Sequence, residues 1–278
     1  MIAILGGPTK GNAALVAGFR RVGLDASLVP PLDARAVLAE GDLAIGRLDV
    51  LPTLDGIEQG LLELTWLERS GVRVVNTARA LLSAHDKRRT WQLLEHAGVA
   101  QPWTTHVSSD EELRGLDLPF VVKPRFGSWG RDVMRCRNRQ ELEGCLDVLR
   151  GRPWYRRHGA IVQELLPGGG RDVRLLVAGG GVVGAVDRTA GRGEWRTNVS
   201  LGGTVRTAAP GGEVRALAIE AATALEAEFV GVDLFPSDHG WVVLELNGAV
   251  EFDDGYALDG RDLFADLADA LALRPVPA

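Results

Sequence analysis

The chain has 278 residues, about twice the usual length of one domain, so we expect two or three packed lobes that share a site. Hydrophobic residues make up 46% and charged residues 24%, a globular composition that excludes a disordered chain. The formal net charge of -6 disfavours nucleic acid and anionic membranes as partners, because both attract basic proteins.

The cysteine content points to a reducing compartment. Only Cys136 and Cys145 are present, and neither lies in the spacing of a metal site or a disulfide framework. No stretch approaches the roughly 20 apolar residues of a membrane span, and residues 1–7 lack the basic start of a signal peptide. We therefore expect a cytoplasmic protein with small molecules or proteins as partners, and neither nucleic acid nor membrane.

Residues 1–83 show the pattern of a small open α/β domain. Three short apolar runs predict strands and two periodic patterns predict helices, at residues 2–5, 26–29, 72–75, 12–22 and 57–69. Strands that alternate with helices predict a mostly parallel sheet. The glycine-containing loop at residues 6–11 matches neither common phosphate-binding pattern, and we interpret it as a tight turn.

Residues 84–162 are predicted to form a second, α+β lobe. Asp86 can cap a helix that runs to residue 96, and patterns typical of β-strands follow it. The further strands and helices are predicted at residues 103–107, 120–123, 133–135, 110–114 and 140–149.

Residues 163–278 are predicted to form a third lobe, with a glycine- and arginine-rich loop at residues 189–203. Its final helix carries an apolar stripe along one face. The strands and helices are predicted at residues 161–165, 173–177, 182–186, 231–234, 241–246, 214–229 and 262–271.

Lysine is rare in this chain. Of 31 basic residues, only Lys10, Lys87 and Lys123 are lysines, and the rest are arginines. A lysine in such a chain marks a position where a compact ammonium is needed and a planar guanidinium would not fit. We apply this interpretation to Lys87 and Lys123, whereas Lys10 lies in the predicted turn.

Lys123 ends an apolar strand, and a flexible loop follows it. The sequence Val-Val-Lys-Pro leads into the loop formed by Gly127, Ser128, Trp129 and Gly130. An ammonium beside backbone N–H groups that can approach closely suits a polyphosphate. An exposed hairpin with a solvated lysine is the alternative interpretation.

Asp233, Glu245 and Asn247 form a second group. Glu245 and Asn247 are two residues apart on a predicted strand, so their side chains lie on one face. Carboxylates on a buried strand are costly unless they are paired or bind a cation, and hard oxygen ligands suit Mg²⁺ held together with phosphates. Pairing with arginines is the alternative.

The third group is the loop with Arg188, Arg192, Arg196 and Asn198. Guanidinium groups in a glycine-rich loop suit a carboxylate or a phosphoryl group in transfer, and a solvated charged loop is the alternative. The five histidines are scattered, and none is predicted to act as a general base.

In this order, these motifs resemble the ATP-grasp fold. The segment Gly-Glu-Trp-Arg-Thr-Asn-Val-Ser-Leu-Gly-Gly at residues 193–203 and the final Glu-Leu-Asn resemble more narrowly the RimK-type amino-acid ligases, including those that extend carrier proteins. The resemblance covers about residues 80–270, and residues 1–83 fit the α/β domain that precedes the fold. It implies an ATP-grasp fold after a small open α/β domain, ATP with Mg²⁺ or Mn²⁺ as cofactors, and family members that often pair into homo-oligomers.

The resemblance also implies roles for individual residues. Lys87 and Lys123 would contact the phosphates of ATP, and the loop from Gly127 to Gly130 would cover them. Gln163 and Glu164 would lie at the adenine edge, and Asp172 would face the ribose. The expected metal ligands are Asp233, Glu245 and Asn247, and the residues expected to face the γ-phosphate and the reacting carboxylate are Arg188, Arg196 and Asn198.

The function implied is an ADP-forming ligase that activates a carboxylate as an acyl phosphate and joins it to an amine. The expected substrates are an amino acid and a carboxylate acceptor, either a small molecule or the C-terminus of a peptide or carrier protein. A kinase-like or dipeptide-forming enzyme, and an ATP-binding regulator or scaffold without ligase chemistry, stay open as alternatives. After Asn247 the chain lacks the Ser-Pro-Gly continuation of the glutamate-adding members, which leaves the substrate open.

Overall fold

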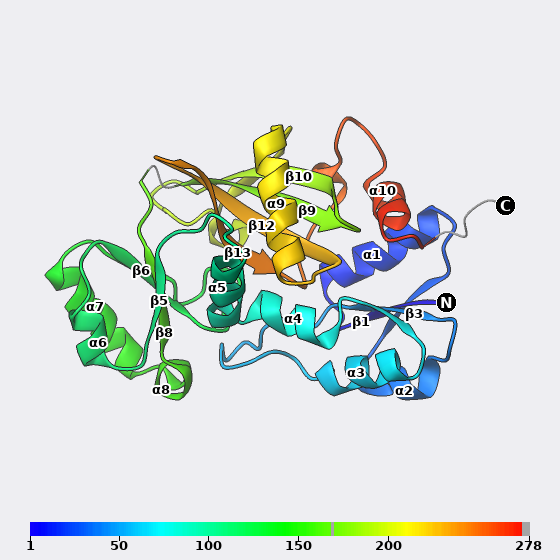
Figure 1. The fold of residues 1–278 in the computed structure, drawn as a ribbon, viewed down its shortest axis with the longest axis horizontal. Coiled ribbons are helices and arrows are strands. Elements are labelled where there is room, and N and C mark those ends of the chain that lie inside the picture. The colour runs from blue at the N-terminus through cyan, green and yellow to red at the C-terminus, as the bar shows by residue number, and fades with distance from the viewer. Residues whose placement is uncertain (168–169, 274–278) are drawn as a thin grey trace.

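The structure is a computed structural model that describes residues 1–167 and 170–273 and contains, in that part of the chain, three β-sheets (Figure 1). The lobe with β5, β6 and β8 lies at one end of the molecule, and β1, β3 and both termini lie toward the other. Helices α4 and α5 lie between these two ends. The predicted mixture of α/β and α+β architecture is confirmed.

The first sheet is parallel, with the strand order β2-β1-β3-β4. Strand β3 was not predicted, because a fully buried strand of four residues lacks the alternation that identifies strands. The predicted helix 57–69 begins only at Leu61, after Gly60 at φ 137°. The strands and helices of this part are β1 (Ile2–Leu5), α1 (Lys10–Arg21), β2 (Ala26–Val29), α2 (Ala34–Val37), β3 (Leu43–Gly46), α3 (Leu61–Arg69), β4 (Arg73–Val75) and α4 (Ala78–His85).

The second sheet is antiparallel, in the order β5-β8-β6-β7, and α6, α7 and α8 belong to the same lobe. Asp86 caps α5 as predicted, and its carboxylate accepts hydrogen bonds from two backbone N–H groups of the first turn. Helices α4 and α8 were not predicted. The elements are α5 (Lys87–His96), β5 (Thr104–Val107), α6 (Asp110–Arg114), β6 (Phe120–Pro124), β7 (Met134–Cys136), α7 (Arg139–Arg150), α8 (Pro153–His158) and β8 (Ala160–Glu164).

The third sheet is antiparallel, in the order β11-β10-β9-β12-β13. The predicted helix 214–229 ends earlier, because the chain turns at Glu226 with φ 55° and Phe229 starts β12. Strand β11 was not predicted. The elements are β9 (Arg171–Ala178), β10 (Gly181–Thr189), β11 (Thr204–Thr207), α9 (Gly212–Ala224), β12 (Phe229–Ser237), β13 (Gly240–Asn247) and α10 (Leu263–Ala270).

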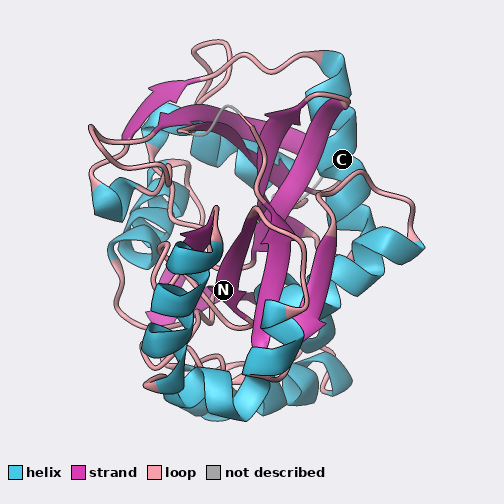
Figure 2. Ribbon diagram, turned by 90° about the vertical axis from the view of Figure 1, so that its left-hand side faces the viewer, coloured by secondary structure: helices cyan, strands magenta, loops and turns pink. Residues whose placement is uncertain are grey.

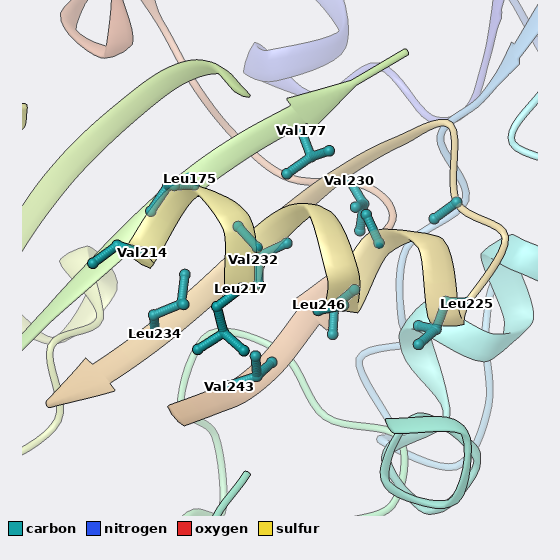
Figure 3. Packing of buried hydrophobic residues seen from close by; sticks show 14 of the residues in the cluster. Leu175, Val177, Val214, Leu217, Leu225, Val230, Val232, Leu234, Val243 and Leu246 are labelled. Atoms are coloured by element: carbon teal, nitrogen blue, oxygen red, sulfur yellow. The ribbon is translucent and has the colours of Figure 1, made fainter. Parts of the chain in front are cut away.

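Helix α9 covers one face of the third sheet (Figure 3). Leu217 from the helix packs among Val232, Leu234 and Val243 of β12 and β13. Turned by 90°, the molecule shows the long strands of this sheet with helices packed beside them (Figure 2). Complete burial of a leucine or valine side chain of this cluster stabilises the fold by about 1.5–3 kcal/mol.

The N-terminal sheet and the third sheet share one hydrophobic core. Ile4 and Phe19 belong to the same buried cluster as Phe229, Phe252 and Phe264. The predicted boundaries at 83/84 and 162/163 fall within α4 and β8, and the division into three domains stays a prediction.

Arg47 fixes the contact between the first sheet and the segment after β13. The side chain is 1% exposed and donates hydrogen bonds to Asn12 Oδ1 (3.0 Å) and the Val250 carbonyl (2.6 Å). Its guanidinium also lies 5.9 Å from the ring centroids of Phe229 and Phe252. The segment that follows β13 is therefore held against the N-terminal sheet.

Two helical glycines offer a matched test of packing. A Cβ at Gly18 in α1 would lie 2.2 Å from Phe264 Cδ1, whereas a Cβ at Gly144 in α7 would meet nothing within 4 Å. We expect Gly18→Ala to lower the free energy of unfolding by about 1–3 kcal/mol through overpacking. Gly144→Ala should raise it by roughly 0.5–1 kcal/mol, because alanine favours helix. Urea denaturation measures both, and equal effects would contradict the packing of α1 on α10.

Among the described residues, no helix is long and apolar enough to span a bilayer.

Candidate functional site

Two neighbouring cavities meet at the third sheet. The first, of about 150 Å³, lies between the second and third sheets and is lined by Lys123 and Gln163 from one side and Asp233 and Glu245 from the other. The second, of about 570 Å³, is lined by residues of α1 and α4, by Asp49 and by residues of the third sheet. The walls of both cavities include Ser128, Arg188, Asn198 and Glu245.

Lys87 and Lys123 both lie in the first cavity. Lys87 is the first residue of α5, and its Nζ donates to the Gly127 carbonyl (2.7 Å) and lies 3.2 Å from Glu245 Oε2. Lys123 stands on β6, and its Nζ donates to Gln163 Oε1 on the adjacent β8 (2.6 Å). Two ammonium groups from the second lobe thus face a carboxylate of the third.

Burial lowers the pKa of Lys123 to about 8, and the nearby Glu245 carboxylate opposes this shift. At neutral pH the Lys123 amine is therefore protonated in most molecules. An ammonium has three N–H donors, and Lys123 gives one of them to Gln163, so it has further donors to offer to an anion.

The loop from Gly127 to Gly130 is held by the arginine-rich loop of the third lobe. Arg196 Nη1 donates to the carbonyls of Gly130 (2.9 Å) and Val133 (3.2 Å), and Ser200 Oγ donates to the Trp129 carbonyl (3.0 Å). A Cβ at Gly130 would lie 2.5 Å from Asn198 Oδ1, so glycine permits this close approach. Arg196 and Asn198 therefore lie against the loop as well as beside the cavity.

The predicted metal ligands lie on adjacent strands. Asp233 on β12 is the cross-strand neighbour of Glu245 on β13, and Asn247 follows two residues later with its Nδ2 buried and without a hydrogen-bond partner. Among the described residues, no three His, Cys, Asp or Glu side chains group together as a metal site. Two carboxylates and an amide oxygen nevertheless fit Mg²⁺, which keeps waters and binds substrate phosphates as well.

Asp233 is already engaged by two arginines. Its oxygens accept from Arg174 Nε and Nη2 (2.6 and 2.7 Å) and from Arg188 Nη2 (2.7 Å). Burial opposes ionisation of Asp233, but the two guanidinium groups outweigh it and lower its pKa. An ionised carboxylate offers about four acceptor positions, so one remains for a cation.

Asp172, which was expected to face a ribose, lines the first cavity, and that role stays a prediction. The side chain is 3% exposed, and its oxygens accept two hydrogen bonds from Arg188 (2.7 and 2.6 Å) and one from Thr197 Oγ1 (2.6 Å). These contacts orient Arg188 toward the cavity.

Gln163 and Glu164 were expected at an adenine edge. The Gln163 side chain is buried. It accepts a hydrogen bond from Lys123 and donates one to Thr104 Oγ1 (3.1 Å). Glu164 is exposed, and its backbone N–H donates to the Trp103 carbonyl. Both residues line the first cavity, Gln163 mainly as a support for Lys123.

Several residues of the site were missed from the sequence. Arg174 lies two residues after Asp172 on β9, and this spacing could have placed both side chains on the same face of the strand. Lys10, Asp49 and His85 line the second cavity, but they come from separate loops and helices, and no local pattern joins them. Burial lowers the pKa of His85 to about 4, with Lys87 acting in the same direction, so the ring is neutral at pH 7.

Comparison with known proteins identifies relatives of this chain. The model of the RimK-like ATP-grasp domain matches residues 84–271. A probable alpha-L-glutamate ligase of Serratia proteamaculans is 31% identical over 78% of this chain and 73% of its own. The corresponding protein of Sodalis glossinidius is 34% identical over 75% of this chain and 70% of its own.

Solved structures share the fold. The D-cycloserine synthetase DcsG superimposes over 99% of this chain and all of its own, with a TM-score of 0.69 at 21% identity. D-alanine–D-alanine ligase from Bacillus anthracis gives a TM-score of 0.69 over 98% of this chain and 96% of its own, at 16% identity. The predicted ATP-grasp fold is confirmed, and with the domain match and the curated relatives it follows that the chain belongs to the RimK-like ATP-grasp family of ATP-dependent, ADP-forming amide-bond ligases.

Proposed function

We propose that ATP occupies the cavity between the second and third sheets, with its phosphates against Lys87 and Lys123. The observation that carries this proposal is the approach of Lys87 Nζ to Glu245 Oε2, 3.2 Å apart across the cleft. Ammonium groups from one lobe and carboxylates from the other are complementary to a nucleotide phosphate chain with its divalent cation. The loop from Gly127 to Gly130 covers the phosphates.

Asp233, Glu245 and Asn247 would hold Mg²⁺, for which Mn²⁺ can substitute. When bound, the cation neutralises negative charge on the phosphate oxygens. Arg174 and Asp172 hold Arg188 and Asp233 in place around this position through the contacts described above.

The reaction proceeds in two transfers. A carboxylate oxygen of the acceptor attacks the γ-phosphorus, the bond to the bridging oxygen breaks, and ADP leaves. The amine nitrogen then attacks the carbonyl carbon of the acyl phosphate, the carbon–oxygen bond to phosphate breaks, and the nitrogen loses a proton. Arg188, Arg196 and Asn198 stabilise the charge on the phosphoryl group and the reacting carboxylate, a task of positioning and electrostatics.

The substrates are an amino acid and a carboxylate acceptor, which we propose is a small molecule or the C-terminus of a peptide or carrier protein. The curated relatives are named for glutamate, but the segment after Asn247 departs from the Ser-Pro-Gly continuation. Lys10, Asp49 and Glu251 give the second cavity both signs of charge, which suits an amino acid with its ammonium and carboxylate groups.

ADP release by the purified full chain tests this function. ATP and Mg²⁺ are supplied with each of the twenty amino acids, alone and in pairs, and with a peptide fraction from cell extract as acceptor. We expect an amino acid together with an acceptor to stimulate ADP release. The product should be heavier than the acceptor by the mass of that amino acid less one water. ATP binding without stimulated release under all conditions would instead support the regulator alternative.

The pH dependence of ATP use follows from Lys123. Its pKa is lowered to about 8 by burial, so the ammonium is present below that pH and is lost as the pH rises through it. We expect kcat/KM for ATP to fall by about tenfold per unit above pH 8, because this parameter reports groups of the free enzyme. Lys123→Met, which has no ammonium to titrate, is the control, and its residual activity should not show this fall. A flat wild-type profile up to pH 10 would contradict the prediction.

A further inference from the structure

Two consecutive residues of the arginine-rich loop reach across to the second lobe. Arg196 Nη1 donates to the carbonyls of Gly130 and Val133 (2.9 and 3.2 Å). The guanidinium of Arg135 on β7 lies 5.6 Å from the centroid of the Trp195 ring, within the range of a cation–π contact. Trp195 and Arg196 both line the first cavity, so these contacts lie at the wall of the proposed nucleotide site.

The carboxylate of Glu194 holds both of these residues. Its Oε1 accepts hydrogen bonds from the backbone N–H groups of Trp195 (2.8 Å) and Arg196 (3.0 Å) and from Arg196 Nε (3.0 Å). Its Oε2 accepts from Arg196 Nη2 (2.8 Å). One carboxylate therefore fixes the backbone from which both side chains extend and the orientation of the guanidinium.

These contacts use most of the donors of Arg196. A guanidinium has five N–H groups in a rigid plane. Nε and one N–H of Nη2 are donated to Glu194, and Nη1 donates to the Gly130 and Val133 carbonyls, so one N–H of Nη2 remains for a phosphate. Because the group is planar, the two bonds to Glu194 also set the direction in which Nη1 points. Without them, the guanidinium could turn away from the two carbonyls.

Glu194 itself does not line the first cavity, so it would act on a nucleotide only through its neighbours. The hydrogen bonds from Arg196 lower the pKa of Glu194 to about 2, and the carboxylate is therefore ionised throughout the pH range of an enzyme assay. Its side chain is 20% exposed and that of Arg196 is 24% exposed. Water weakens an ion pair of this exposure, so the pair contributes little to global stability, and its main effect is on the local geometry of the loop.

We propose that Glu194 is a positioning residue that holds Arg196 and Trp195 against the second lobe and thereby keeps the loop from Gly127 to Gly130 closed over the phosphates of ATP. This inference rests on the proposed nucleotide site, and it adds a residue that contacts no part of ATP. Loss of the Glu194 carboxylate should loosen the loop and weaken ATP binding, while the rest of the fold is unaffected.

Hydrogen exchange of the full chain is the first test, and it needs no nucleotide. In Glu194→Ala, we expect residues 127–133 to exchange about 3- to 10-fold faster than in the wild type, because the tie between this segment and Arg196 opens more often. Helix α9 should exchange at the wild-type rate. Unchanged exchange of residues 127–133 would overturn the proposal.

Calorimetric titration of the full chain with ATP and Mg²⁺ is the second test. Glu194→Ala should raise Kd for ATP about 3- to 10-fold, and Glu194→Gln should raise it less, because glutamine keeps an acceptor oxygen for the backbone N–H groups. The thermal midpoints of both variants should stay within about 4 °C of the wild type. Glu143→Ala is the matched control, since it breaks the two-bond pair with Arg114 outside the cavity and should leave Kd unchanged.

A double-mutant cycle shows whether Glu194 acts through Arg196. Arg196→Ala should raise Kd for ATP at least as much as Glu194→Ala does, and the double variant should match Arg196→Ala alone. Additive effects of the two substitutions, or an unchanged Kd in Glu194→Ala, would refute the positioning role. Absence of ATP binding by the wild type would instead refute the proposed function.

Discussion

Lys123→Met is expected to lower ATP turnover by about 10²- to 10³-fold, the usual effect of removing one donor that stabilises a transferring phosphoryl group. Methionine keeps the aliphatic stem on β6 and removes only the ammonium, so the apolar packing of the strand is retained. Initial rates of ADP release at saturating substrates, together with KM for ATP, measure the effect.

Two controls make the result specific. The thermal midpoint of Lys123→Met should stay within a few degrees of the wild type, because loss of a buried charge offsets the loss of its bond to Gln163. Arg157→Met removes a positive charge from the exposed Arg157–Asp55 pair and should leave turnover unchanged. Near-normal turnover in a folded Lys123→Met protein would contradict the proposed contact between this ammonium and the phosphates of ATP.

Arg188→Ala should destabilise the fold as well as stop the reaction. Arg188 is 4% exposed and bridges the buried carboxylates of Asp172 and Asp233. Without it Asp172 keeps only the Thr197 hydroxyl, while Asp233 keeps Arg174. Loss of one partner from a buried ion pair costs about 3–5 kcal/mol, which urea denaturation should show as a lower free energy of unfolding.

A second substitution tests the cause. In the Arg188→Ala background, Asp172→Asn should recover part of the lost stability, because a neutral amide needs no counter-charge. Arg171→Ala, which breaks the exposed Arg171–Asp187 pair on the same strands, should cost less than about 1 kcal/mol. If Arg171→Ala and Arg188→Ala destabilise equally, the buried network does not hold this part of the fold.

The sequence predicted elements where local chemistry is decisive. Asp86 before α5 and the shared face of Glu245 and Asn247 on β13 were both recognised, because capping and a period of two depend on neighbours in the chain. Strand β3 was missed, since complete burial removes the alternation, and the end of α9 was misplaced, since the turn at Glu226 has no glycine or proline to mark it.

The amino-acid order alone determined the family, the two lysines and the acidic strand, because these are short motifs whose spacing carries the chemistry. Only the tertiary structure decided that Asp172 accepts hydrogen bonds from Arg188 and that Gln163 accepts one from Lys123. Each of these facts joins residues from different elements. Hydrogen bonding and burial depend on which side chains the fold brings within about 3 Å of each other, and local patterns in a single sequence do not contain that information.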